Sequence, residues 1–234
     1  MSTRRTARRG ASSLCHACDT SAVEWRLLAG VSPEDVRRLE AVSKRRVYRR
    51  GQVVFSGDDP ADALHLVVSG HFAVRVTTPT GETVLLAIVG AGDAFGELAL
   101  VSDRSRGATV QAFSDGETLA LHRDAFEALR RARPQVDRSL AVILAERLRR
   151  VNDLVMEAHY VDAEVRVRRR LLELGEAFEG TIPLTQEEIA QTAGTSRATV
   201  NRVLREEEAA GGVELGRGRT TITDAEALRT RATR

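Results

Sequence analysis

Two short helix patterns, separated by a short turn that contains one glycine, lie between residues 185 and 210. They restrict the fold of this chain more than any other feature of its sequence. Thr185 is followed three residues later by Glu188, which forms a capping box at the start of a helix. Gly194 can adopt the positive φ of a tight turn because it has no Cβ, and Ser196 can cap a second helix. The sequence therefore predicts a helix-turn-helix.

The second helix, expected from Arg197 to about Ala210, has an apolar face and a polar face. Val200, Val203 and Leu204 recur at helical spacing and are expected to face the core. Arginines near the beginning of such a helix can enter the major groove, where a guanidinium forms two hydrogen bonds with O6 and N7 of guanine. An ordinary pair of amphipathic helices with solvated arginines is the alternative interpretation.

Gly211 and Gly212 end that helix, and two β-prone runs follow them. These runs flank Arg217-Gly218-Arg219 and predict a hairpin, or wing, whose arginines can contact phosphate. The capping box, the turn glycine, the polar helix face and the basic hairpin occur together, so we favour DNA binding. The predicted DNA-binding residues are Thr185, Ser196, Arg197, Thr199, Asn201, Arg202, Arg217 and Arg219.

Composition indicates a soluble globular protein but says little about its partner. Hydrophobic residues make up 42% and charged residues 29% of the 234 residues, and the formal net charge is only +2. Residues 163–234 contain twelve arginines and twelve acidic residues, so affinity for DNA must come from where the arginines point. The absence of a long apolar run and of a secretory signal pattern predicts a cytoplasmic protein without a membrane partner.

From residue 46 to 122, short β-rich runs alternate with glycine turns. Leu64–Val68, Phe72–Val76 and Thr83–Ile88 are examples of these runs. Many short strands at close spacing, with turn signals between them, predict a sandwich or barrel. His65 and His71 show no metal-ligand spacing and are expected at a strand edge or a turn.

A long helix is expected at residues 134–160, beginning at Pro134. Its apolar residues recur with the spacing four, three, four, three, which is a heptad pattern. A helix packed only on its own domain is the alternative, but charged residues such as Arg147 flank the narrow apolar row and favour a parallel homodimer. The predicted dimer-interface residues are Leu144, Leu148, Val151, Val155 and Ala158.

Two segments together make the chain resemble the CRP/FNR (catabolite activator protein) superfamily of transcription regulators. The first is Phe95–Leu100, with Arg106–Val110 after it, and the second runs from Thr185 through Leu204. The resemblance covers Val31 to Ile222 and implies an α+β fold with a cyclic-nucleotide-binding β jelly roll, a long dimerisation helix and a C-terminal winged helix-turn-helix. It also implies a homodimer on a palindromic site in double-stranded DNA, with RNA polymerase as a further partner.

The expected domains follow from this order of elements. They are a flexible tail at residues 1–20, a β-roll sensor domain at 21–133, the dimerisation helix at 134–160 and the winged helix-turn-helix domain at 161–234.

The first segment predicts a site for a cyclic nucleotide, with cAMP as the preferred allosteric effector. Glu97 can accept a hydrogen bond from a ribose hydroxyl, Arg106 can bind phosphate through two bonds, and backbone N–H groups after Gly96 can hold an anion. At the position where family members contact the base, Asn152 can hydrogen-bond adenine, whereas Val151 cannot. The predicted effector-binding residues are Gly96, Glu97, Leu98, Arg106, Gly107 and Asn152.

Other interpretations of these residues stay open. The Gly96 turn is also a structural corner of a jelly roll, and Arg106 can instead pair with Glu97 in a regulator that acts without a small effector. Cys15 and Cys18 are similar to the cluster ligands of FNR, but such a cluster needs four cysteines and the chain has two. A redox or metal sensor is therefore only an alternative, and no metal site is predicted. The chain carries no esterase elbow or phosphate-loop motif, so we do not expect an enzyme.

Ala198 departs from the family pattern, in which an acidic residue follows the first arginine of the recognition helix and can accept from cytosine N4. Alanine can offer only apolar contact, for instance to a thymine methyl group. The sequence therefore predicts a palindrome that keeps guanine where Arg197 and Arg202 read it and differs from the family half-site at the Ala198 position.

Overall fold

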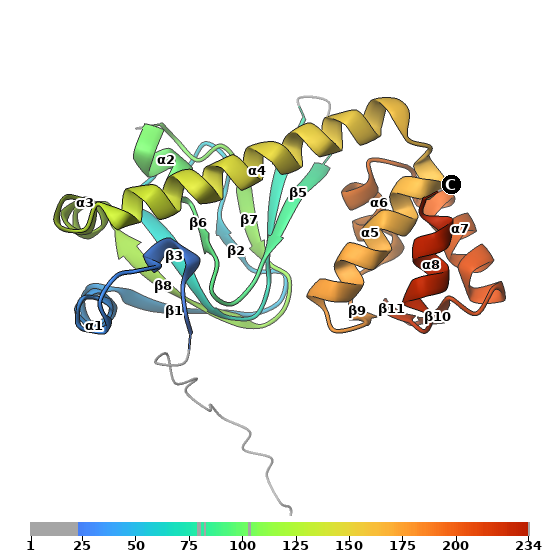
Figure 1. Ribbon diagram of the computed structural model, residues 1–234, viewed down its shortest axis with the longest axis horizontal. Coiled ribbons are helices and arrows are strands. Elements are labelled where there is room, and N and C mark those ends of the chain that lie inside the picture. Colours follow the sequence, from blue (N-terminus) through green and yellow to red (C-terminus); the bar gives the residue numbers. More distant parts are fainter. Residues whose placement is uncertain (1–22, 79–80, 82, 103, 234) are drawn as a thin grey trace, which may run out of the picture.

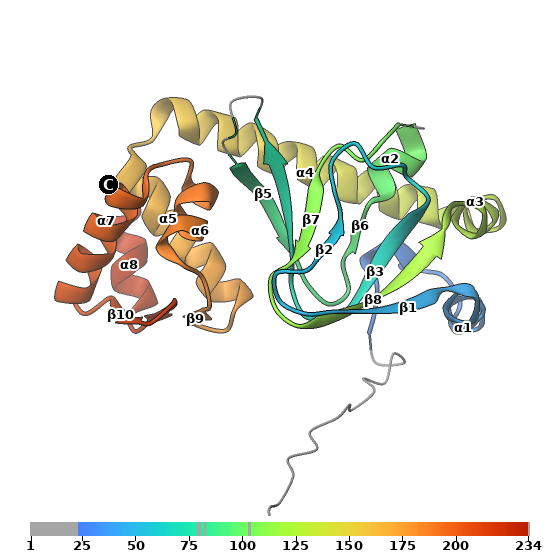
Figure 2. The ribbon, with the colours of Figure 1, turned by 180° about the vertical axis from the view of Figure 1, so that it is seen from behind.

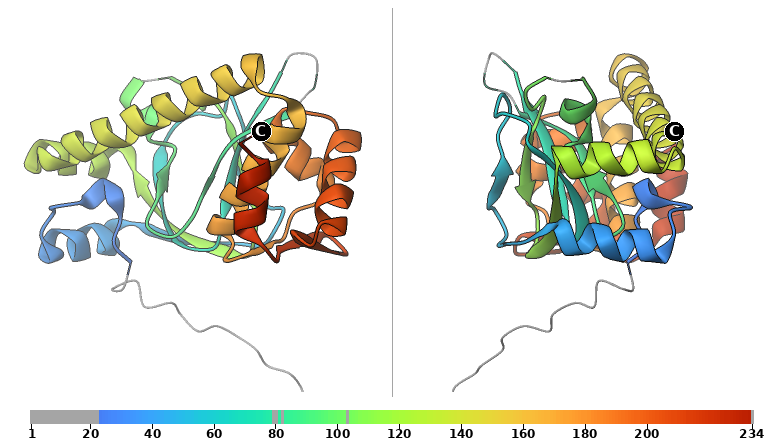
Figure 3. Two further views of the ribbon diagram at one scale, coloured as in Figure 1. Left: turned by 45° about the vertical axis from the view of Figure 1, so that its right-hand side comes forward. Right: turned by 90° about the vertical axis from the view of Figure 1, so that its left-hand side faces the viewer.

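The computed structural model describes residues 23–78, 81, 83–102 and 104–233. It consists of a β-roll and a smaller, mainly helical domain, joined by one long helix, α4 (Gln135–Tyr160). In Figure 1, α4 runs along the β-roll and ends above the helical domain. Figure 3 shows from two further sides that α4 lies along the outside of the roll. This order of elements confirms the predicted fold class.

Two antiparallel four-stranded sheets form the β-roll. One sheet has the spatial order β1 (Lys44–Tyr48), β8 (Gly116–His122), β3 (Ala63–Ser69) and β6 (Ala94–Phe95). The other has the order β2 (Val53–Phe55), β7 (Thr109–Ala112), β4 (Phe72–Thr77) and β5 (Thr83–Val89). Residues from both sheets, including Val67, Phe72, Phe95 and Val110, form one buried cluster between them. The alternation of short strands and turns therefore closes around an apolar core.

The outer face of the first sheet is covered by short helices and by the beginning of α4. The short helices are η2 (Arg26–Leu28), α1 (Pro33–Val42), α2 (Glu97–Ser102) and α3 (Arg123–Ala132). Leu39, Phe126 and Leu140 contribute to the buried cluster that joins α1, α3 and α4 to β3 and β8. Trp25 anchors the segment before η2, because its indole N–H donates to the Val67 carbonyl at 3.0 Å. The first half of α4 is thus part of the sensor core.

His65 lies in the interior and not at a strand edge or turn as the sequence indicated. It is buried in β3, which has neighbours on both sides, and its ring stacks on Phe95 with 5.0 Å between centroids. Its Nδ1 is 3.0 Å from the hydroxyl of Thr118. Burial, with a further contribution from the charge of Arg106, lowers the pKa of His65 from 6.5 to about 4.

This buried histidine is expected to make stability depend on pH. The unfolded chain takes up a proton on His65 near pH 6.5 and the folded chain only near pH 4, so the contribution is lost as pH falls through that window. We expect His65 to lower the free energy of unfolding by about 2 kcal/mol between pH 7 and pH 5. Urea denaturation of the protein and of His65→Phe at both pH values measures how much His65 contributes to this change in the free energy of unfolding. An equal fall in the free energy of unfolding of both proteins would contradict the assignment of this pH dependence to His65.

The C-terminal domain contains the predicted helix-turn-helix and wing. Its helices are α5 (Ala163–Ala177), α6 (Gln186–Ala193), α7 (Arg197–Ala209) and α8 (Ala225–Arg231), and its strands are β9 (Thr181–Ile182), β10 (Val213–Gly216) and β11 (Arg219–Ile222). Figure 2 shows this domain from behind. Two elements go beyond the predicted ones, since β9 pairs with β11 as a third strand and α8 packs against α5.

The two domains also contact each other directly. The ring centroid of Phe178, which follows α5, lies 4.5 Å from that of His71 and 6.3 Å from that of Phe113. Arg50 in the roll donates to the carbonyl of Pro183 at 2.9 Å. The roll therefore touches the loop that leads into α6, the first helix of the helix-turn-helix.

Candidate functional site

The turn between β6 and α2 brings the Gly96 backbone and the Arg106 side chain close together. Gly96 has a φ of 87°, which disfavours any residue with a side chain. A Cβ at this position would lie 2.6 Å from Nη1 of Arg106. The backbone conformation therefore favours glycine here, and a side chain would also displace the guanidinium of Arg106.

Arg106 is only 3% exposed and is held from several sides. Its Nη1 donates to the carbonyl of Gly96 at 2.8 Å, and its Nη2 donates to that of Ala63 at 2.5 Å. The carboxylate of Asp62 lies 3.4 Å from Nη2, and the guanidinium carbon lies 4.1 Å from the centre of the Phe55 ring. Arg106 is thus fixed by carbonyls and a ring, and it forms no ion pair with Glu97 at N···O contact distance.

Glu97 is paired instead with Arg147 on α4. Its carboxylate is 2% exposed, and its Oε1 accepts a hydrogen bond from Nη1 of Arg147. Nη2 of Arg147 donates to the carbonyl of Ala94 at 2.7 Å. Burial raises the pKa of Glu97, while the charge of Arg147 opposes this shift. Arg147 was not among the predicted site residues, although it lies one helical turn before Val151.

Two buried polar atoms at this turn have no hydrogen-bond partner among the described residues: Oε2 of Glu97 and Nε of Arg106. Buried polar atoms are nearly always paired, because an unpaired one loses its hydration without compensation. The carboxylate oxygen can accept a hydrogen bond from a hydroxyl group, and the guanidinium N–H can donate to an anionic oxygen. The turn is therefore chemically suited to a ligand that carries both groups.

The remaining predicted effector residues lie at the surface. Leu98 and Gly107 are exposed, and a Cβ on Gly107 would meet no atom within 4 Å. Asn152 is exposed on α4, and no hydrogen bond joins it to the Gly96 turn within the described part of the chain. The structure thus brings Gly96, Glu97 and Arg106 together and leaves Asn152 outside this group of contacts.

The helix-turn-helix has the capping contacts that the sequence predicts. Thr185 and Glu188 form the capping box of α6, with each side chain bonded to the backbone N–H of the other. Gly194 is left-handed, with a φ of 57°, and ends α6. The hydroxyl of Ser196 accepts from the N–H of Thr199 and caps α7. These local bonds set the tight turn between the two helices.

The predicted DNA-binding side chains differ in how they are held. Arg197 is exposed at the start of α7 and has no ion pair among the described residues, and the same is true of Arg217 and Arg219 in the wing. Asn201 accepts a hydrogen bond from Gln186 at 3.4 Å. Arg202 forms ion pairs with two glutamates, so the two predicted guanine readers are not equivalent.

Comparison with known proteins identifies both domains. The family model of the cyclic nucleotide-binding domain matches residues 45–133, and that of the Crp-like helix-turn-helix domain matches residues 165–231. The CRP-like cAMP-activated global transcriptional regulator of Mycobacterium tuberculosis is 33% identical over 214 residues, which cover 88% of this chain and 96% of the relative. The chain belongs to the CRP/FNR family of transcription regulators.

Two further similarities agree with the CRP/FNR assignment. The cyclic AMP receptor protein of Thermus thermophilus is 38% identical over 205 residues, 86% of this chain and 94% of the relative. The crystal structure of the catabolite activator protein of that organism matches with a TM-score of 0.52 and 36% identity, over 89% of this chain and 98% of the other. This CRP/FNR protein is therefore a DNA-binding transcription regulator with a cyclic nucleotide-binding domain, and not an enzyme.

The second half of α4 carries an exposed apolar row in this CRP/FNR protein. Leu148 is 62% exposed, and Val151, Val155 and Ala158 are exposed as well. Leu144 differs, because it is half-buried against the core of the β-roll. The predicted dimer row therefore begins inside the sensor domain and continues onto a surface that the described residues of its own chain leave exposed.

The alternative based on Cys15 and Cys18 falls on residues outside the described part of the chain. Within the described residues, no three histidine, cysteine or acidic side chains are grouped as a metal site would require. Among the same residues, no helix combines the length and apolar character that a membrane-spanning segment needs.

Proposed function

We propose that this protein is a homodimeric, sequence-specific regulator whose affinity for DNA is controlled by a cyclic nucleotide, cAMP, bound at the Gly96 turn. The observation that carries the proposal is the pair of unpartnered buried atoms, Oε2 of Glu97 and Nε of Arg106. A ribose hydroxyl can donate to the first, and a cyclic phosphate can accept from the second. Relatives described as cAMP-activated and as a cyclic AMP receptor protein support cAMP.

The contacts of Arg106 are compatible with binding phosphate. Its Nε is available as it stands, Nη1 donates to the neutral carbonyl of Gly96, and Nη2 donates to that of Ala63 and lies 3.4 Å from the carboxylate of Asp62. A phosphate oxygen is the stronger acceptor because it is charged, so a two-bond contact can form if one carbonyl bond is exchanged. Glu97 would hold the sugar, and the surface residues Leu98 and Gly107 would border the ligand.

The ion pair between Glu97 and Arg147 supports a route from ligand to DNA. Arg147 lies on α4, which continues through Val151 and Asn152 to Tyr160 and is followed by α5 of the DNA-binding domain. A ligand that binds Glu97 more tightly in one arrangement of α4 than in another shifts the population toward that arrangement. The two recognition helices of the dimer would then match half-sites about one helical turn apart.

The partners follow from this function. The proposed DNA target is a palindrome in double-stranded DNA, read by α7 and contacted at its backbone by the wing. RNA polymerase is the proposed further partner, and the cytoplasm is the proposed location.

DNA binding with and without cAMP tests the effector. We expect fluorescence anisotropy to show tighter binding to the selected palindrome when cAMP is added, and calorimetry to show cAMP binding more tightly than cGMP. Selection from a random DNA library supplies the palindrome. Unchanged DNA affinity at millimolar cAMP would rule out cAMP as the effector while leaving DNA binding intact.

The exposed row on α4 gives a test of the homodimer. Replacing Leu148 by glutamate places one charge from each subunit in the proposed interface. We therefore expect the dissociation constant of the dimer to rise by at least about 100-fold. Val142→Glu is the matched control, because Val142 is also an exposed apolar residue of α4 but lies off the heptad row. Analytical ultracentrifugation measures both variants. Equal dimerisation of wild type and Leu148→Glu would exclude this row as the interface.

A further inference from the structure

Arg202, unlike Arg197, is held by acidic side chains on the exposed side of the recognition helix. Its Nη1 lies 2.6 Å from Oε1 of Glu164 and 3.4 Å from Oε1 of Glu206. Glu206 is one turn further along α7, but Glu164 comes from the first turn of α5. The ion pair with Glu164 therefore ties the recognition helix to a different helix, one that begins directly after the end of α4.

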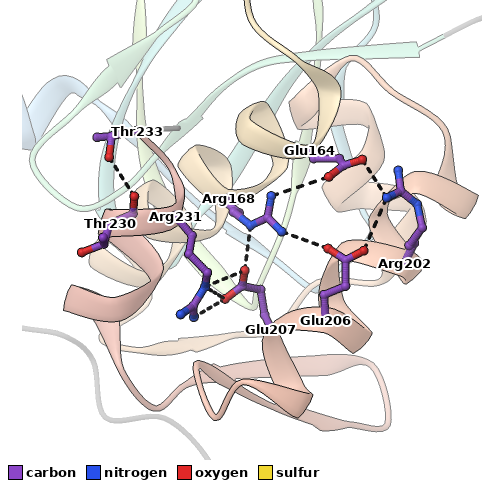
Figure 4. A network of polar contacts seen from close by, with 8 residues as sticks. All are labelled: Glu164, Arg168, Arg202, Glu206, Glu207, Thr230, Arg231 and Thr233. Carbon is purple, nitrogen blue, oxygen red and sulfur yellow. Dashed lines mark hydrogen bonds and ion pairs between the residues drawn. The ribbon is translucent and has the colours of Figure 1, made fainter.

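The two glutamates belong to a network of charged side chains, which Figure 4 shows from close by. Arg168, on α5, contacts Oε2 of Glu206 at 3.0 Å and Oε2 of Glu164 at 3.9 Å. Its Nε donates at 2.7 Å to Glu207, which is 1% exposed and also accepts from Arg231 of α8. Arg168, anchored in this way by Glu207, places a positive charge beside the two carboxylates that pair with Arg202.

The geometry leaves Arg202 able to read a base. Both ion-pair distances are to Nη1, and no hydrogen bond from Nη2 or Nε to an acceptor is found among the described residues. A guanidinium offers five N–H donors in a rigid fork, so the edge formed by Nη2 and Nε can still present two parallel donors. Guanine O6 and N7 accept such a pair. An arginine that is already ordered also loses less rotamer freedom on binding than a free one.

We propose that Glu164 is a positioning residue that sets the Arg202 guanidinium for guanine recognition. The inference rests on the proposed role of Arg202 as a guanine reader. Glu164 does not touch the base, and it acts by pairing with one nitrogen of Arg202, while the positive charge of Arg168 lies 3.9 Å from its own carboxylate. The recognition helix has Ala198 where the family has an acid, so in this chain an acidic residue of α5 contributes to specificity.

The test compares two DNAs that differ at one position of each half-site. Arg202→Ala identifies the position, because it is the one where the preference for guanine over adenine disappears. At that position we expect Glu164→Gln to reduce the ratio of dissociation constants roughly 3- to 30-fold for the two half-sites together. Binding to unrelated DNA should stay equal or become tighter, because each subunit loses one negative charge. In the Arg202→Ala background, Glu164→Gln should have no further effect on the ratio.

Glu208→Gln is the matched control, because it removes an acid that pairs with Arg205 on the same helix and has no contact with Arg202. A ratio that Glu164→Gln leaves unchanged overturns the inference, and so does equal weakening of both DNAs. Tighter binding to the guanine site without loss of preference would mean that Glu164 competes with DNA for Arg202. If Arg202→Ala leaves the preference for guanine over adenine unchanged at every position, Arg202 is not a guanine reader. The inference about Glu164 is then wrong as well.

Discussion

Replacing Arg197 by alanine is expected to weaken binding to the selected palindrome by roughly 30- to 10⁴-fold. A two-bond contact between arginine and guanine contributes about 1–3 kcal/mol, and a homodimer makes this contact in both half-sites. Arg197 is exposed, is the first residue of α7 and has no ion pair among the described residues, so its removal disturbs no contact that the fold needs. Fluorescence anisotropy at constant salt concentration measures the loss.

A wing arginine provides the control for this prediction. Arg217 is also exposed and without an ion pair among the described residues, but it is predicted to contact phosphate. We expect Arg217→Ala to weaken binding to palindromic and to unrelated DNA to the same extent, and to make the affinity depend less steeply on salt concentration. If Arg197→Ala also weakened both DNAs equally, Arg197 would be a phosphate contact and the predicted guanine at its position would be wrong.

Replacing Arg106 by alanine is expected to weaken cAMP binding by roughly 10²- to 10⁴-fold. Charge-assisted hydrogen bonds are worth about 1.5–3 kcal/mol each, and the proposed phosphate contact uses two of them. The same change leaves the carbonyls of Gly96 and Ala63 without their donor, so part of the loss can come from the fold. Calorimetry with cAMP, together with thermal unfolding monitored by circular dichroism, separates the two effects.

Arg106→Lys keeps the prediction testable if the alanine variant unfolds. Lysine keeps the charge but offers a point ammonium in place of the planar fork, so it can neutralise a phosphate without forming two parallel bonds. We expect a folded protein with at least about tenfold weaker cAMP binding. Affinity within twofold of the wild type would show that the fork of Arg106 does not hold the phosphate.

The features that the sequence predicted well are those that depend on neighbours along the chain. The capping box of Thr185 and Glu188, the left-handed Gly194 and the Ser196 cap each need residues only a few positions apart. The glycine-separated strands of the roll and the heptad row of α4 are also periodic patterns. These patterns were sufficient for the strand-rich segment, the long helix and the helix-turn-helix, whereas the order of domains and the group of Gly96, Glu97 and Arg106 followed from the resemblance to the CRP/FNR superfamily.

His65 shows that the alternation of apolar and polar residues does not predict burial in a strand that is covered on both faces. It stands in an apolar run, and β3 is covered on one face by the other sheet and on the opposite face by helices. A strand buried on both faces has no polar side, so alternation along it does not tell which residues face water. The sequence therefore predicts His65 at a strand edge or a turn, whereas the side chain is buried and stacks on Phe95.

By itself the sequence determined the strand-rich and helical parts of the chain and the long helix between them, because these follow from local propensity and spacing, while the residues of the Gly96 site came from the resemblance to the CRP/FNR superfamily. Only the tertiary structure decided which side chains meet. Arg147 reaches Glu97 across 50 positions, and Glu164 reaches Arg202 across 38. Neither pair lies on one element, and opposite charges are so frequent in this chain that composition cannot select a partner. The pairs form because packing of α4 on the roll, and of α7 on α5, brings these charges within bonding distance.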